Sequence, residues 1–106
     1  MSADELNRAV DLLLGQVGHW GTPRWEAEAA NGLGTRADLV HRLVQRLADL
    51  SADVEGEPRR QVPRLGNDLA LPDQLRAIAS DLIAADAPEP VLSAAAADVA
   101  ATRQEL

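Results

Sequence analysis

The sequence predicts an all-α fold, and three features support this prediction. The chain of 106 residues contains 20 Ala and 16 Leu, two residue types that favour helices. It contains only eight Val and two Ile, and no Phe or Tyr, so the residues that fit strands best are few. Its apolar residues recur at spacings of three and four, which is the period of an amphipathic helix. At this length we expect a single domain, residues 1–106, with one core.

The first helix is expected over residues 3–18. Ser2 followed by Glu5 is typical of a capping box at the start of a helix. Leu12 lies about 120° away from the apolar face of this helix, so we expect it to be exposed or to contact a partner. The apolar face consists of Leu6, Val10, Leu13, Leu14 and Val17.

The connection at residues 18–25 follows, and it includes the only two aromatic residues of the chain. Thr22 and Pro23 are typical of a helix cap and a first helical residue. They predict a short extra helix over residues 23–30, between the first and the second long helix.

Trp20 and Trp25 in this connection have two interpretations. They can cover one end of the helical core as large apolar groups. Alternatively, together with His19 and Arg24, they form a candidate binding site, because Trp and Arg are enriched at the energetic centres of protein interfaces. That site would be an exposed interface or a pocket for a small ligand.

The second long helix is expected over residues 36–55. Thr35 followed by Asp38 predicts a capping box at its start, and Gly56 is expected to end it. His41 lies about 140° from the centre of the apolar stripe of this helix. We therefore interpret His41 as solvated and keep it as a secondary candidate site residue.

Residues 57–66 are expected to form an extended loop, because they include two prolines. The segment is locally basic, with three Arg against one Glu. Arg59, Arg60 and Arg64 are secondary candidates for contacting a phosphate or an acidic partner, although a solvated loop is the simpler interpretation.

The last two helices are expected over residues 72–87 and 90–104, separated by the breaking residues Pro88 and Pro90. Ile83 lies away from the apolar face of its helix, and the final helix is rich in alanine. Four long helices with connections of this size predict an antiparallel four-helix bundle.

Several kinds of chemistry lack their residues in this sequence. All ten basic residues are Arg, so there is no Lys for a Schiff base, and there is no Cys for a thiolate or a disulfide. A formal net charge of −7 argues against binding to nucleic acid. No apolar run approaches the roughly 18 residues that a membrane span needs. We expect a cytoplasmic protein with no membrane or nucleic-acid partner, no metal site and no cofactor.

The stretch Thr35-Arg36-Ala37-Asp38-Leu39-Val40-His41, which follows a helix and a loop with Trp and Pro, resembles the start of the second helix in DinB-like four-helix bundles. These include the N-terminal part of mycothiol-dependent maleylpyruvate isomerases. The resemblance implies a metal-binding, thiol-dependent transferase or isomerase bundle. This chain has no histidine after His41 and has Gly34 at the position of the family's Trp, so we expect the bundle without the metal chemistry.

The function expected from these features is that of a small non-catalytic helical module that binds another protein or a second copy of itself. Leu12 and Ile83, which lie away from their apolar faces, and the alanine-rich last helix support this prediction. The alternative is a small-ligand-binding or vestigial DinB-like bundle that uses the Trp/His connection. The sequence offers no arrangement of reactive residues that predicts an enzyme.

Overall fold

The computed structural model describes residues 2–106, and its regular elements are helices. In chain order they are α1 (Ser2–Val17), α2 (Thr22–Glu26), α3 (Arg36–Glu55), the 3-10 helix η1 (Asp68–Ala70), α4 (Leu71–Ala84) and α5 (Glu89–Glu105). Within residues 2–106 the only extended pairing is an isolated bridge between Glu28 and Thr35. None of the described helices is long and apolar enough to cross a membrane. The all-α prediction is confirmed; α3 has its predicted bounds, and the ends of the other long helices lie within three residues of their predicted positions.

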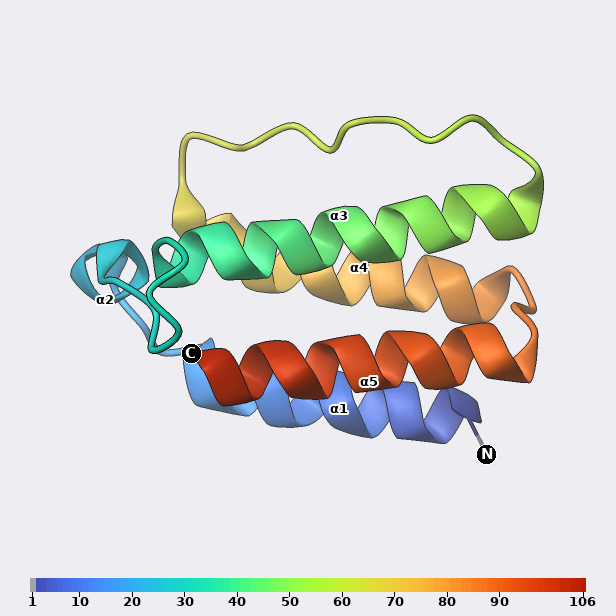
Figure 1. Ribbon diagram of the computed structural model, residues 1–106, viewed down its shortest axis with the longest axis horizontal. Helices are drawn as coiled ribbons and strands as arrows, with labels where there is room; N and C mark the ends of the chain where they lie inside the picture. The colour runs from blue at the N-terminus through green and yellow to red at the C-terminus, as the bar shows by residue number, and fades with distance from the viewer. Residues whose placement is uncertain (1) are drawn as a thin grey trace.

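The four long helices lie side by side, and α2 covers one end of them (Figure 1). The most extensive pairings are α1 with α5 and α3 with α4. Both α3 and α4 begin at the α2 end and run the same way, whereas α1 and α5 both run toward that end (Figure 1). The structure therefore differs from the antiparallel bundle expected from the sequence, because the two helices within each pair are parallel.

Residues 57–67, which we call the strap, allow α3 and α4 to be parallel. α3 has 20 residues, so it is roughly 30 Å long at 1.5 Å per residue. The strap is extended, and a chain of this many residues spans about 36 Å or slightly more. Figure 1 shows the strap returning along the outer side of α3 to the end where α3 began. The sequence predicts the extended loop but not this return path.

α1 and α5 begin at the same level of the molecule. Ser2 is the first residue of α1 rather than its cap, so the expected capping role of Ser2 is wrong. Its hydroxyl instead donates a hydrogen bond to the carboxylate of Glu89, the first residue of α5, at 3.1 Å. This hydrogen bond joins the first turns of the two parallel helices directly.

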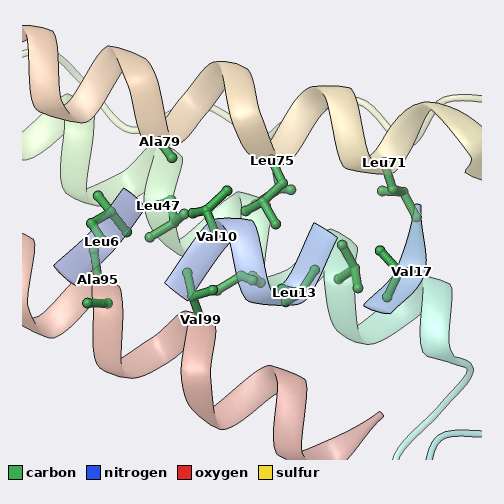
Figure 2. Close-up of a cluster of buried hydrophobic side chains, with 14 of the residues drawn as sticks. Leu6, Val10, Leu13, Val17, Leu47, Leu71, Leu75, Ala79, Ala95 and Val99 are labelled. Atoms are coloured by element: carbon green, nitrogen blue, oxygen red, sulfur yellow. The ribbon is translucent and has the colours of Figure 1, made fainter. Parts of the chain in front are cut away.

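The core between the long helices is apolar and is built from one residue every three or four along each helix. α1 contributes leucine and valine, whereas α5 contributes smaller side chains, so α5 can lie close to α1. Figure 2 shows these side chains pointing toward one another; the labelled residues are Leu6, Val10, Leu13, Val17, Leu47, Leu71, Leu75, Ala79, Ala95 and Val99.

The short helix α2 begins and ends differently from the prediction. Its N-cap is Gly21 rather than Thr22, and no side chain of the described residues caps it. It ends at Glu26 because Ala27 is already extended, with φ −68° and ψ 149°.

Residues 27–35 form a loop in place of the second half of the predicted helix. The Ala29 N–H donates to the carbonyl of Gly34 at 2.8 Å, which reverses the chain. The Ala30 N–H donates to the carbonyl of Glu105 at 3.1 Å, which attaches the loop to the end of α5. These bonds replace the ones that a longer helix would make.

The capping box at the start of α3 is confirmed. The Thr35 hydroxyl accepts a hydrogen bond from the Asp38 N–H, and the Asp38 carboxylate accepts one from the Thr35 N–H, both at 3.0 Å.

Replacing Thr35 with Ala should lower the free energy of unfolding by about 1 kcal/mol, because the Asp38 N–H at the start of α3 loses the hydroxyl that accepts its hydrogen bond. Thr22→Ala is the matched control, since the sequence predicts Thr22 as a cap, whereas it is the first residue of α2 and its side chain caps nothing. We expect it to change the free energy of unfolding by less than about 0.5 kcal/mol. Urea denaturation followed by circular dichroism compares the two, and equal losses would contradict this assignment of the caps.

Candidate functional site

Trp20, Arg24, Trp25 and Arg36 gather at the α2 end of the molecule, and we call them the tryptophan cap. Trp25 is 1% exposed and Trp20 is 9% exposed. The two rings meet edge to face, with centroids 5.1 Å apart and planes at 70°, an arrangement that the quadrupoles of aromatic rings favour. Both rings belong to the main apolar cluster, so they cover one end of the core.

Two guanidinium groups lie over the ring of Trp20. The Cζ atom of Arg36 is 5.1 Å from the ring centroid, and that of Arg24 is 5.7 Å from it. Both distances are within the range of a cation–π interaction. Arg36 also donates to the carbonyl of Arg24 at 3.3 Å, which links the two residues. The cap therefore presents positive charge to solvent and very little aromatic surface.

The two histidines lie in different surroundings. His19 is exposed in the connection between α1 and α2. His41 is half-buried on α3, and its Nε2 atom lies 3.2 Å from the carbonyl oxygen of Val62 in the strap. The expectation of a solvated His41 is therefore wrong, because the strap covers the outer side of α3. Among residues 2–106, no group of three or more His, Cys, Asp or Glu is close enough together to hold a metal ion.

Arg59 and Arg64 of the strap form ion pairs with acidic residues of α3. Arg59 donates two hydrogen bonds to the carboxylate of Asp53, at 2.7 and 3.0 Å. Arg64 donates to the carboxylate of Asp38 at 3.0 Å. The local excess of positive charge in this loop thus faces negative charge on the neighbouring helix of the same chain.

Gln45 holds the middle of the strap through its side-chain amide. Its Nε2 atom donates to the carbonyl of Arg60 at 3.0 Å, and its Oε1 atom accepts from the N–H of Val62 at 2.7 Å. One side chain therefore binds both a donor and an acceptor of the strap backbone. Arg60 contributes its carbonyl here, while its side chain is not needed for this contact.

Hydrogen bonding lowers the pKa of both strap-binding carboxylates. For Asp38 the main cause is the hydrogen bond from the Thr35 backbone, and the hydrogen bond from Arg64 adds to it. For Asp53 the cause is the hydrogen bond from Arg59. Both bonds favour the ionised carboxylate.

A third surface is the groove between α1 and α5, which we call the α1/α5 groove. Its volume is about 590 Å³, and Leu12, Ala97 and Ala100 are among the residues that line it. Leu12 is 51% exposed, as its position away from the apolar face of α1 suggests. Ile83 is different, because it is half-buried and packs against the core.

Four charged residues also line the α1/α5 groove: Asp4, Glu5, Arg8 and Arg103. None of them forms an ion pair within the part of the chain that the structure describes. The acidic pair lies in the first turn of α1, and Arg103 lies in the last turn of α5. Because the two helices are parallel, Asp4 and Glu5 lie at one end of the groove with Arg8 one turn above them, and Arg103 lies at the other end.

The predicted site residues thus fall into two separate groups. His19, Trp20, Arg24 and Trp25 are near the α2 end, whereas the secondary candidates lie along the outer side of α3; these are His41, Arg59, Arg60 and Arg64. Sequence reasoning missed Arg103 and the other charges of the α1/α5 groove. The only sequence signals for that surface are Leu12 and the alanines of the last helix.

Comparisons with protein-family models, with curated proteins and with solved structures find no match for this chain. The resemblance to DinB-like bundles therefore remains a hypothesis, and so does a binding role for the eight predicted residues.

Replacing Trp25 with Ala should lower the free energy of unfolding by about 3–5 kcal/mol, because the substitution leaves a large cavity at the end of the core. His19→Ala should change it by less than about 0.5 kcal/mol, since His19 is exposed. Urea denaturation measures both. In the unaltered protein, tryptophan emission should be blue-shifted and protected from iodide. A loss below about 1 kcal/mol for Trp25→Ala would contradict a structural role.

The ionised carboxylate of Asp38, which accepts hydrogen bonds from the Thr35 N–H and from Arg64, should stabilise the protein at neutral pH and not in acid. Because the pKa of Asp38 is lowered on folding, the stabilisation is complete above the unfolded pKa of about 3.9 and is lost as the pH falls through the lower folded value. Asp38→Asn should therefore destabilise the protein above about pH 4, and the difference should shrink toward pH 2. Urea denaturation across this range tests this, and a difference that does not vary with pH would contradict it.

Proposed function

We propose that this chain is a helical protein-interaction module and that it binds another polypeptide through the α1/α5 groove. The observation that carries the proposal is the exposure of Leu12 beside a surface of alanines. Grooves between helices commonly accept an amphipathic helix, whose apolar side chains they cover. Small residues on one wall let the backbone of such a helix approach closely.

Leu12 supplies the apolar contact of the groove. Fully burying a leucine side chain contributes about 1.5–3 kcal/mol, and Leu12 has about half of its surface still to bury. The charged residues at the two ends of the groove add orientation, because they favour a partner with the opposite order of charges.

The tryptophan cap is the weaker candidate for an interface. Trp25 is buried and the ring of Trp20 is flanked by Arg24 and Arg36. A partner would therefore meet guanidinium groups rather than an aromatic anchor.

Photo-crosslinking in cells that produce the protein tests this proposal. The photoreactive residue benzoylphenylalanine is placed at position 12 in one variant and at position 69 in a control. Leu69 is 47% exposed, similar to Leu12, but belongs to η1 and lies outside the groove. We expect a discrete covalent product from position 12 and none from position 69. Equal products from both positions, or no product from either, would contradict an interface at the groove.

A further inference from the structure

We propose that the strap is a processing site at which an arginine-directed endopeptidase cuts the bond between Arg60 and Gln61, and that the cut protein keeps its fold as two associated chains. The site is separate from the proposed interface, because no residue of the strap lines the α1/α5 groove. The conformation of the strap, the state of its arginines and the pairing of helices across the cut support the proposal.

The strap already has the backbone conformation that an endopeptidase binds. It is the longest stretch without a helix in residues 2–106, and ten of its eleven residues are exposed, with Val62 half-buried. Figure 1 shows it running along the outside of the molecule. An extended peptide can form main-chain hydrogen bonds with a binding protein, whereas a helix must first open locally. Exposed loops are accordingly preferred sites of proteolytic cutting.

The arginines restrict where such an enzyme can cut. All ten basic residues are arginine, so an arginine-directed endopeptidase has ten candidate positions. Three of them lie in the strap. The other seven lie within helices, where cutting requires local unfolding; these are Arg8, Arg24, Arg36, Arg42, Arg46, Arg76 and Arg103.

Arg60 differs from the other two arginines of the strap. Arg59 is paired with Asp53, and Arg64 is paired with Asp38. The side chain of Arg60 is exposed and forms no ion pair with any described residue. Endopeptidases of this specificity bind the guanidinium group in a pocket that contains a carboxylate. Arg60 can enter such a pocket without breaking an ion pair, so it is the preferred residue.

Cutting at this position adds one water molecule across the peptide bond. The carbonyl carbon of Arg60 takes the hydroxyl group and the nitrogen of Gln61 takes the proton, which leaves a new carboxylate and a new amine. The endopeptidase supplies the catalytic groups, and this chain supplies only the substrate segment.

Gln45 holds the backbone on both sides of this bond. Its Nε2 atom donates to the carbonyl of Arg60 at 3.0 Å, and its Oε1 atom accepts from the N–H of Val62 at 2.7 Å. An endopeptidase needs the same carbonyl oxygen for its oxyanion hole. Cutting therefore requires Gln45 to release the strap, and this side chain sets how often the bond becomes available.

The helices pair across the cut. One product, residues 1–60, includes α1, α2 and α3, and the other, residues 61–106, includes η1, α4 and α5. The most extensive pairings, α1 with α5 and α3 with α4, each join one product to the other. The whole core therefore holds the two chains together, and we expect a dissociation constant of roughly 1 µM or tighter.

The cut changes the cover over the outer side of α3. The Nε2 atom of His41 lies 3.2 Å from the carbonyl oxygen of Val62, and it must donate there because a carbonyl only accepts. After the cut, Val62 is the second residue of a free end, and the two backbone groups that Gln45 binds belong to different chains. The middle of the strap is then no longer held from both sides, which uncovers His41.

Brief digestion of the full chain with trypsin, followed by mass spectrometry, tests the position of the cut. We expect residues 1–60 and 61–106 as the first products, and we expect them to elute together from a size-exclusion column at about 50 µM. A first cut within a helix overturns the proposed site. Products that elute separately overturn the two-chain assembly.

Three variants test the roles of single residues. Arg60→Gln should slow the first cut about tenfold or more, because the carboxylate of the enzyme pocket loses its partner, whereas the control Arg64→Gln should not slow it. Gln45→Ala should speed the cut about tenfold, because the strap loses two hydrogen bonds, while circular dichroism stays unchanged. Unaltered cutting of Arg60→Gln overturns the assignment of the bond, and unaltered cutting of Gln45→Ala overturns the role of Gln45.

Modification of histidine by diethyl pyrocarbonate, mapped by mass spectrometry, tests the uncovering of α3. His41 should react about fivefold faster in the cut protein, because it loses its hydrogen-bond partner. His19 is exposed and lies outside the strap, so it should react equally before and after the cut. Equal reactivity of His41 in the intact and the cut protein overturns this consequence of processing.

Discussion

The return of the chain along α3 is the constraint on which the rest of the structure depends. Because the strap brings the chain back to the α2 end, α4 starts beside the start of α3 and runs parallel to it (Figure 1). The turn between α4 and α5 is short, so α5 must run in the opposite direction and lies parallel to α1. The pairing of α1 with α5, and the groove between them, therefore follow from the path of the strap.

The parallel pairing also explains why the charges are separated along the groove. Acidic residues are favourable in the first turn of a helix and basic residues in the last turn, because of the helix dipole. Asp4 and Glu5 occupy the first turn of α1, and Arg103 the last turn of α5. In an antiparallel pair these preferences would place acid beside base at one end. In a parallel pair they place Asp4 and Glu5 at one end of the groove and Arg103 at the other.

Local signals in the sequence predicted the starts and stops of single helices, and non-local packing decided the rest. Thr35 with Asp38 and Gly56 act as expected, because capping depends on a few neighbouring residues; Gly56 has a φ of 69° and ends α3. Thr22 shows the limit of such signals, since Gly21 is the cap. The exposure of Leu12 follows from helix geometry alone. The presence of Arg103 in the same groove does not follow from helix geometry, because the path of the strap determines which helix lies beside α1. The contact between His41 and the strap was unpredictable because it also depends on the path of the strap.

The same non-local packing separates the aromatic residues from the proposed interface. Leucine, valine and alanine make up most of the core, and at the α2 end Trp20 and Trp25 cover it. Once buried there, they have little surface left for a partner. A partner at the α1/α5 groove would therefore meet one exposed leucine, several alanines and a few charges, and no aromatic side chain.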